Sequence, residues 1–449
     1  LRNLEPADGS SYNTAVGSQA GIAVTTAIKN TLIGGLAGDA LNTGAFNVAV
    51  GMQALSADTK GAKNVAIGQG ALEAQNFTSA TDSYNTAVGH PAGLSITTGV
   101  ANTIIGGLAG DALTDADYNV AIGHQALSAD TLGNNSVAIG DAALRAQNFT
   151  SATNTFNVAV GASAGISVTT GVQNTLLGAL AGDALTDADF NVAVGYLALT
   201  ADTLGSRSVG IGYGALQSQN FTSATNSHNV AVGFKAGEGV TTGLRNTLVG
   251  ASAGTHGGDL STGNDNICIG YDNGVQPTGA NQIVIGTGFV VGGNNDFSFG
   301  KASNVVTNDF DADAAFSRSS DLRLKTNVAN ATLGLNFIND LRPVTYKWKA
   351  SADLDANDAE LAHLRVADAD DNIINHMTTD VTMHGLIAQE VKTALDTASV
   401  STFKGWHEDQ YGVQQISREM FVIPLIKAIQ ELSATNNALT ARITALEGA

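Results

Sequence analysis

Cysteine is almost absent from this chain of 449 residues, which contains one, and proline is scarce at five. A single cysteine excludes an intrachain disulfide framework and any zinc site that needs several cysteine ligands. Aromatic residues make up 6% of the chain, with two tryptophans, so the core is not rich in large rings. We find no signal-peptide pattern and no apolar run near the roughly 18 residues that span a bilayer, so we expect no membrane insertion.

Basic side chains are also few, since 21 Lys and Arg accompany 40 Asp and Glu and give a formal charge of −19. This charge disfavours binding to nucleic acid and to anionic membrane surfaces. Residues 1–300 hold only 8 of the 21 basic residues and neither tryptophan, which indicates a boundary near residue 300. Because the sequence begins with Leu1 rather than Met, we expect the N-terminus to be truncated.

Glycine is abundant, and a five-residue unit, Asn13-Thr-Ala-Val-Gly17, recurs through most of the chain. Its copies are spaced 17, 17, 17 and then 21 residues apart, so that blocks of four repeat every 72 residues. The sixteen visible copies begin at Asn13, Asn30, Asn47, Asn64, Asn85, Asn102, Asn119, Ser136, Asn157, Asn174, Asn191, Ser208, Asn229, Asn246, Asn266 and Gln282.

Each position of the unit has a physical meaning. A β-branched residue follows the Asn, an aliphatic residue comes two later, and positions two apart share one face of a strand. The residue between them points the other way and is mostly Ala, the closing Gly permits a sharp turn, and the recurring Asn favours an amide ladder. The pattern predicts a parallel β-solenoid with one strand and 17 residues per turn, on the order of 75 Å long.

The fourth unit of each block is followed by four extra residues within Gln-Asn-Phe-Thr-Ser. We expect these insertions to protrude as loops that expose Phe77, Phe149 and Phe221 at regular intervals along the rod. Loops on a rigid scaffold are a common place for recognition, so these are candidate receptor loops. Packing of the same rings on the next turn is an equally good interpretation.

The Asn-x-Ala-Val/Ile-Gly units of residues 10–290 resemble the head repeats of trimeric autotransporter adhesins. The resemblance implies a left-handed parallel β-roll within a homotrimer, although those heads use shorter repeats.

Several motifs inside the rod do not indicate chemistry. The nucleophile-elbow pattern at Gly161–Gly165 is a turn of the repeat, because the same place reads Gly-Ser-Gln-Ala-Gly at residues 17–21. The acidic turn with Asp111, Asp115 and Asp117 is either a calcium site or, as we favour, a solvated turn. We expect no metal site and no cofactor, and we expect Cys268 to be a buried apolar residue.

The C-terminal third differs from the rod and carries four ordered blocks. They are Ser319-Ser-Asp-Leu-Arg-Leu-Lys325, Leu341-Arg-Pro-Val-Thr-Tyr-Lys-Trp348, His384-Gly-Leu-Ile-Ala-Gln-Glu-Val391 and Tyr411-Gly-Val413. These blocks resemble the C-terminal intramolecular chaperone of bacteriophage tail spikes and fibres, the endosialidase-type autoproteolytic domain. The resemblance covers residues 320–449.

That resemblance implies a domain that trimerises, guides folding of the preceding β-rich region and then cuts the chain between Ser319 and Ser320. It implies a Ser–Lys dyad with Ser320 as nucleophile and Lys325 as base. Four further residues are candidates for supporting the site or the trimer interface: Asp321, Arg323, Gln389 and Glu390.

The residues themselves are compatible with this dyad but do not establish it. A lysine can take the serine proton only if burial or another cation lowers its pKa. A spacing of five places Ser320 and Lys325 on opposite faces of a strand and far apart around a helix. A turn or a neighbouring subunit must therefore bring them together, and without the resemblance Ser320 would be interpreted as a helix N-cap.

Apolar residues near the end of the chain alternate at steps of four and three, from Leu425 to Leu446, with Asn436 within the series. This heptad pattern predicts a coiled coil over residues 421–447. One amphipathic helix packed on its own domain is the alternative. Ile and Leu in these places nominally favour two strands, whereas the resemblance implies three.

Together these features predict a mainly β protein: a trimeric parallel β-solenoid over residues 1–290, an irregular connector over 291–319 and an α+β chaperone domain over 320–449. We expect a homotrimeric phage tail fibre or spike that is made in the host cytoplasm, resides in the virion and attaches to a glycan or outer-membrane receptor. Other tail proteins would bind its upstream segment, and single-turnover autoproteolysis would be its only enzymatic activity.

Two other functions remain open. One is a bacterial trimeric surface adhesin, which the soluble C-terminal helix disfavours. The other is a glycan-depolymerising tail spike whose catalytic domain lies upstream of Leu1.

Overall fold

The computed structural model describes residues 10–309, 321–365, 373 and 379–448. The chain forms two compact units, Leu1–Ser319 and Ser320–Ala449, and each is described by itself.

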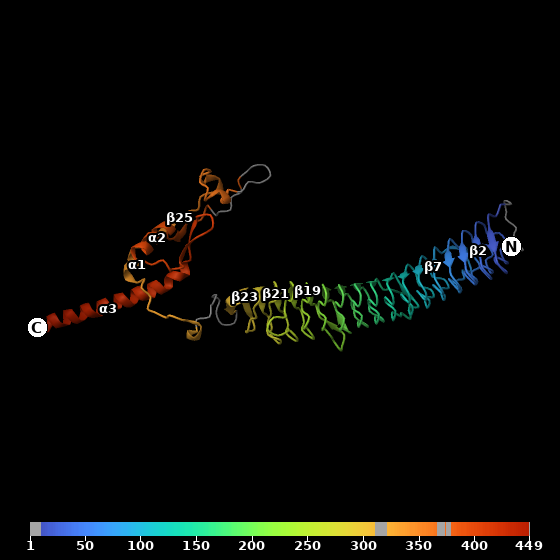
Figure 1. Cartoon of the computed structure of the whole chain (residues 1–449), viewed down its shortest axis with the longest axis horizontal. Helices are drawn as coiled ribbons and strands as arrows, with labels where there is room; N and C mark the ends of the chain where they lie inside the picture. The colour runs from blue at the N-terminus through green and yellow to red at the C-terminus, as the bar shows by residue number, and fades with distance from the viewer. Residues whose placement is uncertain (1–9, 310–320, 366–372, 374–378, 449) are drawn as a thin grey trace. The chain divides into compact units, whose positions relative to one another are not determined.

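The first unit is a β-solenoid rod in which each turn, or rung, adds one short strand to a single long sheet (Figure 1). The strands of this sheet are β1 (Thr14–Val16), β2 (Thr31–Ile33), β3 (Val48–Val50), β5 (Val65–Ile67), β7 (Thr86–Val88), β8 (Thr103–Ile105), β9 (Val120–Ile122), β11 (Val137–Ile139), β13 (Val158–Val160), β14 (Thr175–Leu177), β15 (Val192–Val194), β17 (Val209–Ile211), β19 (Val230–Val232), β20 (Thr247–Val249), β21 (Ile267–Ile269), β22 (Ile283–Thr287), β23 (Asp296–Lys301) and β24 (Asn304–Asp309). The predicted β-solenoid is therefore confirmed.

From β1 to β23, neighbouring strands of this sheet pair in parallel and without any shift between repeat positions. Thr31 of β2 pairs with Thr14 and with Val48, and every later rung continues the same register. Each four-residue insertion adds a two-stranded parallel pair beside the main sheet. These pairs are β4 (Gly61–Ala62) with β6 (Thr81–Asp82), β10 (Gly133–Asn134) with β12 (Thr153–Asn154), and β16 (Gly205–Ser206) with β18 (Thr225–Asn226).

The interior of the solenoid is narrow and apolar. From β2 onward, the middle residue of each three-residue strand is fully buried, as are Leu41 and Leu113 on other walls of their rungs. Burying a leucine contributes about 1.5–3 kcal/mol relative to leaving it exposed, so the stacked rungs supply the core that one rung lacks. Cys268 occupies one of these middle positions and is buried, as the sequence predicts.

A ladder of asparagines joins the rungs along the rod. The backbone N–H of Asn47 donates to Oδ1 of Asn30 at 2.8 Å, and Nδ2 of Asn30 donates to the carbonyl oxygen of Gly44 at 2.9 Å. Both side chains are buried, where water cannot reach. Each amide therefore supplies the hydrogen-bond partner that a buried backbone group needs. The predicted amide ladder is present, and it fixes one rung on the next.

The glycine that closes each unit is required by close approach of the backbones. Gly17 has a φ of 133°, and a Cβ built on it would lie 2.4 Å from the carbonyl oxygen of Gly34 in the next rung. Any side chain here would force the rungs apart, which explains why glycine recurs at this position.

The rod is one rung longer than the sixteen predicted from the repeat. β23 pairs in parallel with β22 and places Phe297 and Phe299 in the positions of the β-branched and aliphatic residues. β24 then folds back antiparallel on β23. The repeat search missed this rung because its outward residues are aromatic and its middle residue is Ser298.

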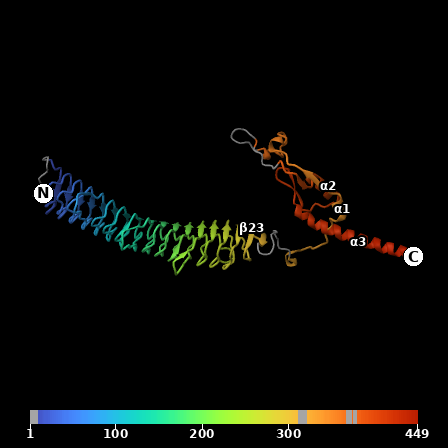
Figure 2. The ribbon, with the colours of Figure 1, turned by 180° about the vertical axis from the view of Figure 1, so that it is seen from behind.

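The second unit is a small α+β fold with a long C-terminal helix (Figure 2). Its elements are η1 (Leu322–Leu324), α1 (Leu335–Asn339), β25 (Val344–Tyr346), η2 (Ser351–Asp353), η3 (Ala362–Leu364), β26 (Met383–Gly385), α2 (Ala388–Thr397), β27 (Trp406–Glu408), β28 (Gln414–Ile416), η4 (Arg418–Phe421) and α3 (Val422–Glu447). β25 pairs with β26, and β27 pairs with β28, both antiparallel.

The core of this unit is small. It is formed by Leu333, Phe337, Val391, Ala394, Leu395 and Phe421. Phe337 stacks on Phe421 with ring centroids 6.2 Å apart, and Phe403 meets both rings. α3 is tied to the start of α1, because the Leu335 N–H donates to the Glu431 carboxylate at 2.7 Å.

Candidate functional site

The insertions of the rod do not expose their phenylalanines. Phe77, Phe149 and Phe221 are only 6%, 7% and 6% exposed, so the expectation of exposed rings is wrong. The Phe77 N–H donates to the buried Asp58 carboxylate at 3.3 Å, and its carbonyl accepts from the Thr59 hydroxyl at 2.9 Å. These bonds hold the residue against the preceding rung, and the equivalent residues of the other two blocks make the same bonds.

For one of these rings, a glycine provides the space. A Cβ on Gly205 would lie 2.7 Å from the ring of Phe221. The rings are therefore packing residues, and the exposed parts of the insertions are the tripeptides that follow them. These are residues 78–80, 150–152 and 222–224, each Thr-Ser-Ala.

A buried polar network, not found by sequence reasoning, supports each insertion. Oδ1 of Asp58 accepts from the Gly61 N–H at 2.9 Å, its Oδ2 accepts from the Gln75 side chain at 2.7 Å, and Gln75 in turn accepts from Asn85. The same set recurs with Asp202, where burial raises the pKa of the carboxyl group. Its only sequence signal is an Asp and a Gln 17 residues apart in every block.

The main sheet leaves one long apolar surface uncovered. The first and third residues of each parallel strand of this sheet from β1 to β22, and Phe297 and Phe299 of β23, point outward, and we call these two columns the outer face. Their side chains are mostly Val, Ile and Thr, and all are half-buried or exposed. Contiguous apolar surfaces of this size usually mark an interaction site.

The predicted cleavage boundary lies partly outside the described residues, since Ser319 and Ser320 are not among them. Directly after it, the side chain of Asp321 caps the start of η1. The Asp321 carboxylate accepts a hydrogen bond from the Arg323 N–H at 2.8 Å and forms an ion pair with the Arg323 guanidinium at 2.7 Å. The guanidinium lowers the pKa of the Asp321 carboxyl. Residues 321–330, with Lys325, are all exposed in this single chain.

The other two predicted supporting residues lie on α2. Glu390, in the first turn of the helix, forms an ion pair with Arg342, which sequence reasoning did not single out. Arg342 belongs to the Leu341-Arg-Pro343 block, so the block pattern was the available signal. Gln389 lines a chiefly apolar cavity of about 1010 Å³ together with Tyr346 and Trp348. The structure thus gives Gln389 and Glu390 different surroundings.

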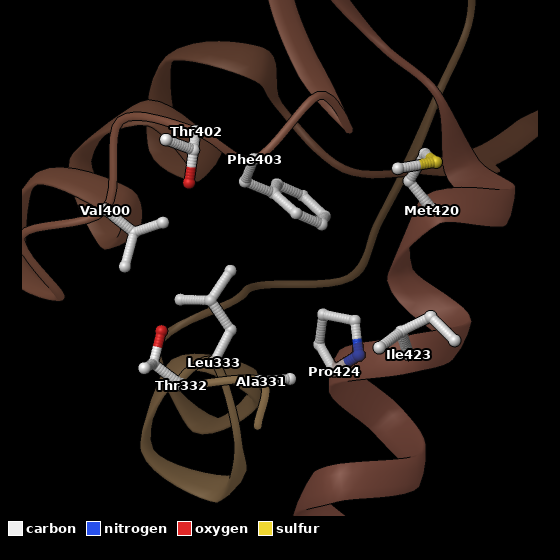
Figure 3. Close-up of a pocket in the computed structure, with 9 residues that line it drawn as sticks. All are labelled: Ala331, Thr332, Leu333, Val400, Thr402, Phe403, Met420, Ile423 and Pro424. Atoms are coloured by element: carbon white, nitrogen blue, oxygen red, sulfur yellow. The ribbon is translucent and has the colours of Figure 1, made fainter. Parts of the chain in front are cut away.

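A second, smaller pocket of about 250 Å³ lies where the segment before α1 passes the start of α3. Figure 3 shows Leu333, Phe403 and Pro424 pointing toward one shared space. None of its nine lining residues is acidic, basic or a histidine, so it suits an apolar group and not proton transfer.

The heptad residues of α3 form an exposed stripe in the single chain. Their side chains are all exposed. They are Leu425, Ile429, Leu432, Asn436, Leu439, Ile443 and Leu446. The predicted helix is therefore present, and it presents the apolar seam that a coiled coil buries.

The acidic turns of the rod bond to neighbouring rungs. Asp115 accepts from the Thr98 hydroxyl at 2.6 Å, and Asp117 accepts from the Val100 N–H at 2.7 Å. Within the described ranges, no three His, Cys, Asp or Glu side chains come together in a way that could hold a metal ion. Among the same residues, no helix has the length and apolarity needed to cross a membrane.

Comparison with known proteins adds one finding to this geometry. The chain matches no curated protein and no solved structure. Residues 320–399 match the family model described as chaperone of endosialidase, so the match begins where the second compact unit begins. A domain of this kind that follows a β-solenoid rod fits a tail fibre with an intramolecular chaperone domain.

Proposed function

We propose that this protein is a homotrimeric bacteriophage tail fibre or spike that attaches the virion to its host. Its C-terminal unit assembles and folds the rod and then cuts itself off. The observation that carries this proposal is the chaperone of endosialidase match over residues 320–399, placed directly after a solenoid rod.

The outer face of the rod supports a partner that is another copy of the chain. The face repeats once per rung over seventeen parallel strands, so a partner that covers all of it needs the same axial spacing. A parallel copy of the rod has that spacing. At about 4.8 Å per rung and three residues per strand, the face is about 80 Å long and 10 Å wide, close to the roughly 800 Å² per partner of a stable interface.

The C-terminal helix supports the same assembly. Ile429 and Leu432 belong to an exposed seam that a coiled coil would bury. Three copies joined through α3 would hold three chain ends at one level, from which the rods could associate. We propose three copies, as the adhesin-like repeat and the chaperone resemblance both imply.

The proposed cleavage is an attack by the Ser320 hydroxyl oxygen on the carbonyl carbon of Ser319. Lys325 accepts the hydroxyl proton and delivers it to the nitrogen of Ser320 as the carbon–nitrogen bond breaks. The resulting ester between Ser319 and the Ser320 side chain is then hydrolysed by water, which gives residues 1–319 and 320–449.

The segment around the proposed cleavage site is exposed in the single chain, which supports cleavage only after assembly. Lysine acts as a base only where burial or a nearby cation disfavours its charged form, and residues 321–330 are exposed in the single chain. We propose that neighbouring copies cover this segment in the trimer. Cutting would then follow assembly and would not compete with it.

We propose that host attachment uses the exposed tips of the insertions, residues 78–80, 150–152 and 222–224, in place of the buried phenylalanines. Successive tips lie four rungs, about 19 Å, apart along the rod. A trimer would present nine such tips, so weak contacts with a repeated surface receptor could add together.

Intact mass measurement after expression tests the central claim. Wild-type protein should give fragments 1–319 and 320–449, whereas Ser320→Ala and Lys325→Ala should remain full length. Ser319→Ala is the matched control, because it changes the neighbouring residue but keeps the nucleophile, and it should still be cut. Cleavage of Ser320→Ala at the same bond would show that the nucleophile is wrong.

A further inference from the structure

The outer face, which we propose as the trimer interface, cannot by itself align three rods. The outward residues Val137 and Ile139 of β11 are the same as Val209 and Ile211 of β17, one 72-residue block later. A copy that slips by one block would therefore meet nearly the same surface. Register is weakly specified where shifted pairings look alike.

The edges of this face differ between blocks. We call the residue after each closing glycine the corner stripe, because it borders the face where the strand ends. From the end of the third block to the start of the fourth, this stripe holds Tyr196, Tyr213 and Phe234, which are 47%, 42% and 53% exposed. Tyr213 stacks on Phe234 with centroids 5.2 Å apart, and Tyr196 lies 5.8 Å from Tyr213. Three successive rungs thus form one exposed aromatic surface.

The other blocks lack this surface. One block earlier the corner stripe holds His124, Asp141 and Ala162, and His124 pairs with Asp141 at 3.1 Å. Two blocks earlier it holds Met52, Gln69 and His90. The aromatic cluster therefore marks one height on the rod.

The opposite edge of the face also changes with the block. It is formed by the residue before each five-residue unit, and on the three rungs of the aromatic cluster these are Phe190, Arg207 and His228. The Arg207 guanidinium already lies 4.9 Å from the Phe190 ring centroid. One block earlier Asn135 occupies the place of Arg207, so the cation is absent there.

We infer that Tyr196, Tyr213 and Phe234 of one copy pack on the opposite edge of a neighbouring copy and lock the register of the trimer. This rests on the proposed homotrimer. In a closed ring of three, one edge of each face meets the other edge of the next copy. In register, the rings lie against Phe190 and Arg207, which suits stacking and cation–π contact. After a slip by one block they meet Tyr118 and Asn135, which keeps an aromatic partner but loses the cation.

A spin-label distance measurement tests this inference. A single label on Ser79→Cys reports the height of each copy, and a one-block slip adds an axial offset of four rungs, about 19 Å. Native Cys268 does not interfere, because it is buried and burial raises the pKa of its thiol to about 12. The rod is prepared by cleavage of the full chain and is then annealed just below its melting temperature.

The variant Tyr196→His/Tyr213→Asp/Phe234→Ala gives these three positions the corner residues found 72 residues earlier. Wild-type rods should keep one distance distribution, and the variant should gain a second, longer one, with slipped trimers increased by about tenfold or more. Tyr213→Phe, which keeps the ring, and Tyr118→Ser, which removes an exposed ring from the opposite edge, should both behave as wild type.

A variant that stays trimeric with a single distance after annealing would overturn the register lock while leaving the proposed trimer intact. Rods that are monomeric by light scattering would overturn both proposals. A second distance in the wild-type rod itself would also contradict the lock.

Discussion

The rod and the C-terminal unit differ in how far apart in sequence their contacts lie. In the rod, each rung bonds to the rung about 17 residues away, and the bonds of Asn30 with Asn47 repeat with little change along its length. In the C-terminal unit, Leu335 bonds to Glu431 and Arg342 to Glu390, 96 and 48 residues apart, and these contacts occur once. Repetition specifies the shape of a rung, whereas unique contacts specify which parts of a chain must meet.

This difference explains why a repetitive rod benefits from a non-repetitive partner. The rod has a continuous buried core of its own but an outer face that looks alike in every block. The C-terminal unit has a small core and an exposed heptad seam. In the proposed function, three copies associate through that seam and their chain ends are thereby held at one level. The sequence of the rod does not encode this alignment.

The largest expected effect comes from breaking the seam. Ile429→Asp/Leu432→Asp places charges where a coiled coil buries apolar side chains, so the full chain should fail to trimerise and its rod should aggregate. Gln430→Asp, on the exposed surface between them, is the control and should assemble normally. Light scattering of the soluble fraction measures the outcome, and a trimeric double variant would contradict the role of α3.

The next effect concerns the rod without its partner. Residues 1–319 expressed alone should give aggregates or mixed oligomers, because parallel pairing of successive rungs is slow and leaves strand edges open until the rod is complete. The same fragment released by cleavage of the full chain should remain a stable trimer. If the directly expressed fragment assembles cleanly into that trimer, the C-terminal unit is dispensable for folding.

A smaller effect distinguishes packing from recognition in the rod. Phe77→Ser, Phe149→Ser and Phe221→Ser together should lower the melting temperature strongly, since deleting a buried Phe costs about 3–5 kcal/mol. Thr78→Ala, Thr150→Ala and Thr222→Ala alter only exposed tips and should leave melting unchanged while weakening attachment to host cells. A triple Phe variant that melts like wild type would show that the buried rings contribute little.

The difference between repeated and unique contacts also decides how well the sequence predicts each region. Period, strand position, the Asn ladder and the glycine turns of the rod could be inferred, because one physical cause acts at the same place in every rung. The seventeenth rung was missed where Phe297 and Phe299 replace the aliphatic residues. Phe77 was expected to be exposed because a polar insertion surrounds it, and nothing local shows that Asp58 and Thr59 of the previous rung hold it inside.

In the C-terminal unit the sequence predicts the seam of α3, because a heptad is also a repeat. It does not predict the pairing of Glu390 with Arg342, or the cap that Glu431 provides for Leu335, because these depend on a fold without periodicity. The roles of Ser320 and Lys325 stay predictions, since they come from the resemblance and Ser320 lies outside the described residues.

The smallest expected effect is a difference in how the two regions respond to acid. Burial raises the pKa of Asp202 in the rod, so its ionised form opposes folding, and acidification through its folded pKa should increase rod stability. The hydrogen bond from the Leu335 N–H, followed in importance by that from Lys427, lowers the pKa of the Glu431 carboxyl group. The stability that Glu431 contributes is therefore present above the unfolded pKa of this group, near 4.5, and is lost at lower pH. Scanning calorimetry of separated fragments should show the rod melting about 1–3 °C higher near pH 4 than at pH 7 and the C-terminal unit weakening only below about pH 4.5. Asp202→Asn should reduce the first difference and Glu431→Gln the second, and a rod that loses stability between pH 7 and pH 4 would contradict the assignment to Asp202.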